Sequence, residues 1–141
     1  MSVQPAHLRG IRLFQENRIP EAMLALDEAL REGETAELWN DWATVNVAAG
    51  RFGEAEKGFG RALELDPKDC QAAVNLGVLL VGSGRIKEAV PLLKGGATGI
   101  DEEQRKIVLQ LLSGCRAKSK SRRKAPGTKR QRPSNAGVKR N

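Results

Sequence analysis

Apolar and polar residues follow each other along this chain with the period of an amphipathic helix. Between residues 38 and 49 the apolar side chains recur at steps of three and four, which places them on one helical face. Gly50 can take a positive φ and end that helix. A second amphipathic run follows, and its apolar side carries Phe52, Ala55, Phe59, Ala62 and Leu63. Pro67 lacks the N–H that a continuing helix needs, so the segment 36–69 predicts a hairpin of two helices.

The same spacing returns on both sides of this hairpin. In the central copy, 36–69, positions 4, 7, 8, 15, 17, 20, 24, 27 and 32 are Trp39, Trp42, Ala43, Gly50, Phe52, Ala55, Phe59, Ala62 and Pro67. The copy 70–103 fills the first eight of these positions with Ala73, Leu76, Gly77, Gly84, Ile86, Ala89, Leu93 and Gly96. A copy over 3–36 matches less well, and Asn17 replaces its hinge glycine. Three consecutive copies predict stacked hairpins with a continuous core.

These residues resemble the tetratricopeptide repeat family, whose pattern is a large residue, then Leu-Gly, Ala, Phe, Ala and Pro at the same spacing. The resemblance covers roughly residues 3–103. It implies helix-turn-helix units stacked into a right-handed superhelix with a concave groove, and a role in binding proteins.

One more helix is expected after the third copy, over about 102–117. Asp101 is its candidate N-cap, and Ile107, Val108, Leu111 and Leu112 form an apolar stripe that would cover the open edge of the third copy. Pro91 and the pair Gly95-Gly96 predict a short or kinked helix before it. The fold class is thus all-α, a solenoid of seven helices: three units and a capping helix in a domain spanning 3–117, then a disordered tail over 118–141.

Charge separates this tail from the rest of the chain. Residues 1–115 carry 17 acidic and 13 basic side chains, whereas residues 116–141 carry 11 basic ones and no acidic one. With few apolar residues the tail cannot bury enough surface to offset the entropy of ordering. Its candidate polyanion-binding residues are Lys118, Lys120, Arg122, Arg123, Lys124, Lys129, Arg130 and Arg132. Nucleic acid, ribosome, acidic lipid, a nuclear-import role and mere solubilisation all stay open for it.

The composition argues against several kinds of site. Cys70 and Cys115 lie far apart in helical contexts, so free thiols and a cytoplasmic location are expected. Two cysteines and one histidine make a metal site improbable, and no cofactor is expected. The longest apolar run, Val78 to Val81, is too short to span a membrane, so no integral membrane association is expected.

Catalysis is not expected either. His7 is the only histidine, and we expect an exposed helix residue with no partner to orient it. Trp39 and Trp42 are three residues apart on one helical face and are interpreted as core residues.

The resemblance places a peptide groove on the first helices of the three units. Its candidate residues are Asn40, Asp41, Thr44, Gln71, Val74, Asn75 and Val78. In chaperone-docking arrays the corresponding surface holds a terminal carboxylate with Lys, Asn and Arg. The matching places here are His7, Ile11, Asp41, Gln71 and Asn75, so the cations are absent. Amides beside aliphatic side chains suit an extended peptide instead.

Three hypotheses follow. The first is a non-enzymatic adaptor that binds an extended peptide or protein segment in its groove. The second is an accessory module for a bacterial glycosyltransferase or methyltransferase, which segments like 37–51 resemble. The third is a nucleic-acid- or ribosome-associated protein that acts through the basic tail.

Overall fold

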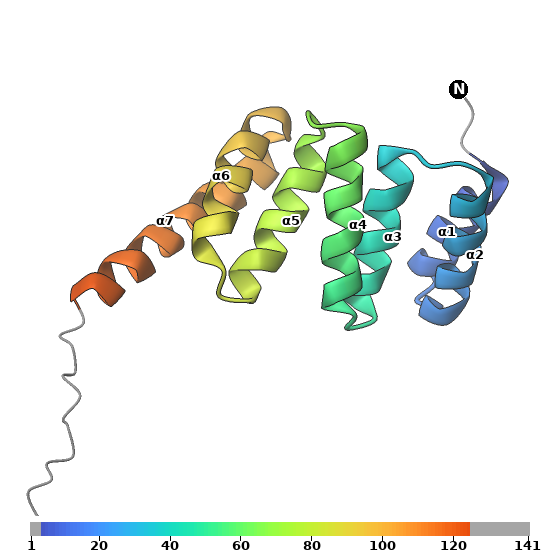
Figure 1. Ribbon diagram of the computed structural model, residues 1–141, viewed down its shortest axis with the longest axis horizontal. Helices are drawn as coiled ribbons and strands as arrows, with labels where there is room; N and C mark the ends of the chain where they lie inside the picture. The colour runs from blue at the N-terminus through green and yellow to red at the C-terminus, as the bar shows by residue number, and fades with distance from the viewer. Residues whose placement is uncertain (1–3, 125–141) are drawn as a thin grey trace, which may run out of the picture.

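Seven α-helices and one short 3-10 helix make up the part of the chain that the computed structural model describes, residues 4–124, with side chains to residue 118. They are α1 (Pro5–Gln15), α2 (Ile19–Glu32), α3 (Ala36–Ala48), α4 (Phe52–Leu65), α5 (Cys70–Gly82), α6 (Ile86–Gly96), η1 (Ala97–Gly99) and α7 (Glu102–Lys124). Figure 1 shows α1 to α6 following one another along the long axis of the molecule, while α7 runs obliquely past α6 at the C-terminal end. The helices pack as the pairs α1–α2, α3–α4 and α5–α6, as the three copies predicted.

The turn inside each pair is built the same way three times. Asn17, Gly50 and Gly84 take φ of 62°, 78° and 79°. An arginine follows each of them, and its backbone N–H closes the turn on a carbonyl of the preceding helix, at 2.8 Å (Arg18 to Leu13), 2.8 Å (Arg51 to Asn46) and 2.9 Å (Arg85 to Leu80). This is the Schellman arrangement, which needs one left-handed residue. Asparagine tolerates that conformation, so the first copy keeps the turn without a glycine.

Polar side chains cap α3 and α5, the first helices of the second and third units, and also α7. Thr35 accepts a hydrogen bond from the backbone N–H of Leu38, and Asp69 accepts one from that of Ala72, both at 3.0 Å. Asp101 accepts one from the N–H of Gln104 at 2.8 Å, as predicted. Asp101 caps α7 in the same way that Thr35 and Asp69 cap α3 and α5, so α7 begins like the first helix of a further unit.

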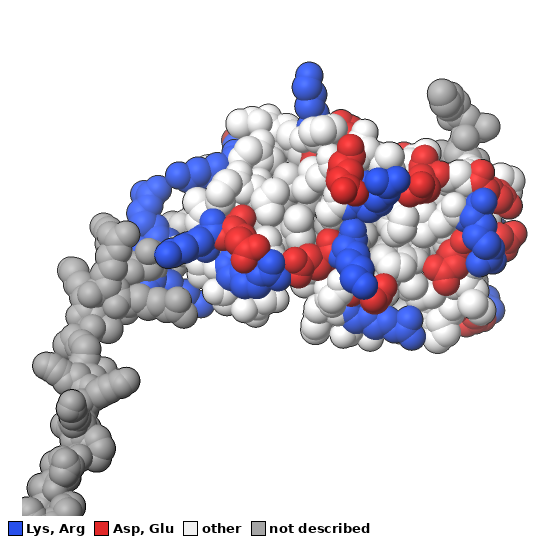
Figure 2. Space-filling model, in the orientation of Figure 1, with Lys and Arg blue, Asp and Glu red and all other residues white. Residues whose placement is uncertain are grey.

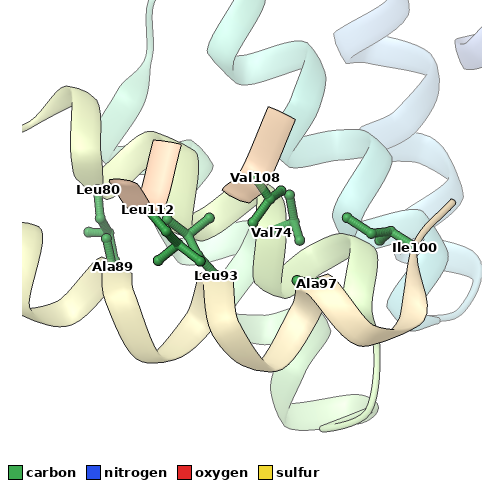
Figure 3. Packing of buried hydrophobic residues seen from close by; sticks show 8 residues of the cluster. All are labelled: Val74, Leu80, Ala89, Leu93, Ala97, Ile100, Val108 and Leu112. Atoms are coloured by element: carbon green, nitrogen blue, oxygen red, sulfur yellow. The ribbon is translucent and has the colours of Figure 1, made fainter. Parts of the chain in front are cut away.

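Three apolar clusters fill the spaces between the helices. The first joins α1, α2 and α3 around Leu26 and Leu38, and the second joins α3 and α4 around Phe59. The third packs α5 and α6 against η1 and α7 (Figure 3). Ala43, Ala55 and Ala62 are fully buried, and their small side chains allow α3 and α4 to approach closely. The helix that contains Pro91 is short, with 11 residues, and passes into the 3-10 helix η1.

Several expectations about single residues were wrong. Phe52 and Ile107 were assigned to apolar faces, yet they are 54% and 62% exposed. Phe52 is the first residue of α4, before that helix meets its neighbours. On α7 the buried stripe is Val108, Leu112 and Cys115, one residue further round the helix than Ile107. Trp39 and Trp42 are both partly buried, but only Trp39 departs from the expectation of a core residue, because Trp42 packs against the first and second apolar clusters.

Helix α7 also runs further than expected. It was predicted to end near 117, and the tail was predicted to start at 118 without structure, yet residues 118–124 are helical. Lysine, arginine and alanine are good helix formers, and the first breaker after Gly114 is Pro126, which disfavours helix at the residue before it. The rest of the predicted tail, 125–141, lies outside the described residues.

Candidate functional site

The amides predicted for the groove lie together and bridge two helices. Asn75 on α5 donates from Nδ2 to Oδ1 of Asn40 on α3 at 3.1 Å. Gln71 Nε2 donates in turn to Oδ1 of Asn75 at 3.2 Å. Thr44 uses its hydroxyl to bond the backbone carbonyl of Asn40 at 2.9 Å. The structure therefore brings these four residues together on the face made by the first helices.

The two valines of the candidate groove differ in exposure. Val78 is 47% exposed, so it is accessible on this face. Val74 is 7% exposed and belongs to the core cluster that also contains Val108 of α7 (Figure 3). Val74 therefore supports the surface from below, while Val78 is available for contact.

His7 was expected to be exposed and without a partner, and this expectation was wrong. Its side chain on α1 is buried, and its Nε2 lies 2.7 Å from Oδ2 of Asp41 on α3. The ring is buried because it lies between α1 and α3, the first helices of two successive units. Asp41 thus belongs to the candidate surface, but its carboxylate is held by the neighbouring unit.

The repeat itself contains the signal that could have found this pair. His7 holds position 5 of the first copy and Asp41 position 6 of the second. Asn40 and Asn75 hold positions 5 and 6 of the second and third copies. The same two positions therefore meet across adjacent first helices in both places. Comparing residues about one repeat apart would have paired both sets.

Burial raises the pKa of the Asp41 carboxyl above its ordinary value. The hydrogen bond and charge of His7 act in the opposite direction, and the charges of Glu37 and Asp69 add to the increase. None of the seven candidate groove residues is a lysine or an arginine. This surface therefore has acidic, amide and apolar groups to offer, without a cation for a terminal carboxylate.

The basic residues predicted to bind polyanions lie at the other end of the molecule. Lys118 is exposed on α7, and the same helix contains residues 120, 122, 123 and 124. Figure 2 shows basic side chains gathered around α7, whereas acidic and basic side chains alternate over the rest of the visible face. Lys129, Arg130 and Arg132 lie outside the described residues.

Two negative findings apply to the described part of the chain. In residues 4–124 no helix has the length and apolar character needed to cross a membrane. Within the same residues no three His, Cys, Asp or Glu side chains form a group that could hold a metal ion.

Comparisons with known proteins agree on one fold. A family model described as tetratricopeptide repeat matches residues 46–98. The Sgt2 TPR domain from Aspergillus fumigatus has a TM-score of 0.75 and 18% identity, with 97% of this chain and 95% of that chain covered. The TPR2B domain of yeast Sti1, solved as a complex with pHsp70, has a TM-score of 0.73 and 20% identity, with coverages of 80% and 94%.

A third similar structure comes from a bacterium. The Yersinia enterocolitica type III secretion chaperone SycD, solved with a peptide of the translocator YopD, has a TM-score of 0.75 and 14% identity. The alignment covers 81% of this chain and 92% of that chain. Identities this low show the shared fold alone. No curated protein matches the chain.

Proposed function

Because the chain has the fold of tetratricopeptide-repeat domains and a model of that family matches residues 46–98, we propose that it is a non-enzymatic adaptor that binds an extended protein segment along the face formed by α1, α3 and α5. The observation that carries the proposal is the polar ladder on that face. It consists of the pair His7–Asp41 and the chain Gln71–Asn75–Asn40, which together join the first helices of all three units.

The ladder prepares the surface for an extended backbone. Asn40 accepts a hydrogen bond through Oδ1, so its Nδ2 group is left to donate to a carbonyl of a bound segment. Val78 and Leu8, which are 47% and 49% exposed, offer apolar contacts for side chains. An extended peptide presents carbonyls and side chains alternately, so a face of fixed amides and exposed aliphatic residues fits it.

Two further observations support this role. Proteins of similar fold have been solved with protein partners: SycD with a YopD peptide, and the TPR2B domain of Sti1 with pHsp70. The single histidine of this chain is buried against Asp41 and is therefore not available to a substrate. Both observations favour binding over catalysis.

The test is a peptide selection with matched surface variants. Peptides are selected from a random displayed library with the full chain, and their affinities are measured by fluorescence anisotropy. Val78→Glu should weaken binding at least about tenfold, because a charge replaces an apolar contact. Asn75→Ala should weaken it less, and neither variant should change the helical circular dichroism.

Leu24→Glu is the matched control. Leu24 is an apolar residue on α2 with 68% exposure, outside the proposed face. It should leave the affinity unchanged. Peptides that bind Val78→Glu as tightly as the wild type would show that the binding surface lies elsewhere.

A further inference from the structure

A pocket opens on the side of α3 opposite the polar ladder. Trp39 and Trp42 of α3 line it together with Glu54, Lys57, Gly60, Arg61 and Glu64 of α4, and its volume is about 610 Å³. At 3.6 residues per turn, residues 39 and 42 point away from residues 40, 41 and 44. The pocket therefore belongs to the outer side of the molecule, where α3 lies between α2 and α4 (Figure 1).

The two indole rings are held in fixed positions. Their centroids lie 5.2 Å apart with an interplanar angle of 79°. Trp39 donates from Nε1 to Oε1 of Glu34 at 2.7 Å, and Trp42 donates from Nε1 to Oδ1 of Asp27 at 2.8 Å. With both N–H groups engaged, the part of each ring that is exposed to the pocket is aromatic surface without a free donor.

Acidic groups outnumber basic ones around these rings. Arg61 is engaged by Glu34 at 3.0 Å and by Glu64 at 3.2 Å, so its charge is neutralised. Lys57 lies 3.5 Å from Glu54. Together with Asp27 the surroundings contain four carboxylates and two cations. The field at the ring faces therefore favours a positive charge.

We propose that this pocket binds a cationic side chain of a partner protein, and arginine in particular. A guanidinium group stacks on an indole face and can bond a carboxylate through two parallel N–H groups at the same time. The rings supply the first contact, and either Glu54 or Glu64, at opposite ends of the row of α4 residues that line the pocket, supplies the second. The site lies on the other side of α3 from the proposed peptide face, so neither proposal depends on the other.

Gly60 allows the pocket to be filled without damage to the fold. A Cβ placed on Gly60 would have no neighbouring atom within 4 Å, and the same holds for Gly53 on the same helix. Only Gly60 lines the pocket. Gly60→Leu should therefore block the site, while Gly53→Leu, the same substitution in the first turn of the same helix, is the control.

The chain also provides its own probe. It contains two tryptophans and both line the pocket, so both indole N–H signals in a nitrogen–proton NMR spectrum report on this site. The full chain is titrated with a short acetylated peptide, Gly-Ser-Arg-Ser-Gly amide, and with the same peptide containing citrulline, which has the shape of arginine without the charge. Both indole signals should shift to saturation with the arginine peptide, and citrulline should weaken the affinity about two- to fivefold.

The variants then test the site directly. Gly60→Leu should abolish the saturable shift at an unchanged or higher melting temperature, and Gly53→Leu should leave it intact. The double change Glu54→Gln and Glu64→Gln should weaken the arginine peptide about as much as citrulline does. Equal shifts with arginine and citrulline, a shift that never saturates, or full binding by Gly60→Leu would each overturn the proposal.

Discussion

The two sides of α3 are built from neighbouring residues, yet they offer different chemistry. On the inner side Asp41 bonds to the first helix of the unit before, and Asn40 bonds to the first helix of the unit after. On the outer side Trp39 and Trp42 bond to carboxylates at Glu34 and Asp27. The inner side presents amides next to aliphatic residues, and the outer side presents aromatic rings among acids.

The difference shows how a thin solenoid obtains two surfaces from one helix. Residues 39 and 40 are adjacent in sequence but point to different sides, because each residue turns the helix by more than a quarter of a circle. In each case a polar bond to a neighbouring element fixes the side chain. Substitutions on the inner side, on the outer side or in the apolar layer between them should therefore have different effects, and these effects distinguish the two surfaces.

The largest effect is expected from the layer between the two sides. Phe59 on α4 is 2% exposed and packs in the cluster with Ala43 and Ala55. Phe59→Ala should lower the free energy of unfolding by about 3–5 kcal/mol, because it removes buried surface and leaves a cavity. Urea denaturation followed by circular dichroism measures the change. A loss below about 1 kcal/mol would mean that α3 and α4 are held by other contacts.

Substitution of two glycines of α4 should change the free energy of unfolding by smaller amounts and in opposite directions. A Cβ on Gly58 would lie 2.8 Å from both the Cβ of Ala43 and the ring of Trp42, whereas Gly60 faces open space. Gly58→Ala should therefore lower the free energy of unfolding by about 1–3 kcal/mol. Gly60→Ala should raise it by about 0.5–1 kcal/mol, because alanine is the better helix former. Thermal and urea unfolding of the two variants check the opposite signs, and equal signs would contradict the packing on the outer side of α3.

The smallest effect is a pH dependence confined to the inner side. The pKa of Asp41 is raised above 3.8 by burial, and the charges of Glu37 and Asp69 contribute to the increase against the effect of His7. A carboxyl with a higher pKa in the folded chain binds its proton more tightly there, so its contribution to stability falls as the pH rises above the unfolded value.

Asp41→Asn removes this titration and keeps a hydrogen-bonding group beside His7. The free energy of unfolding of the wild type minus that of the variant should therefore decrease as the pH rises above the ordinary pKa of an aspartate carboxyl. Urea titrations at several pH values measure the difference. A difference that is constant or that increases with pH would contradict the direction of the Asp41 shift.

Much of the fold was predictable because its signals are local. Gly50, Pro67 and Asp101 mark helix ends through their own backbone geometry or side chain, and each behaves as predicted. Even the irregular Asn17 keeps the turn of its unit. Local signals of this kind do not require knowledge of any neighbour.

The candidate sites were predictable only in part, because exposure depends on neighbouring helices. Asn40 and Asn75 were placed on the right face, but the bond between them and the partner of His7 were not foreseen. The tryptophans fit the pattern of core residues, and only the space between α2 and α4 leaves them open.

By itself the sequence determined the helices, their pairing and the repeat, because hydrophobic period and turn residues act within a few positions of the chain. Tertiary structure decided which side chains are buried and which residues about one repeat apart form hydrogen bonds with each other. His7 and Asp41 are 34 residues apart, and Trp42 and Asp27 are 15 apart. The distance between such groups is set by the stacking of whole helices, and no local pattern contains it.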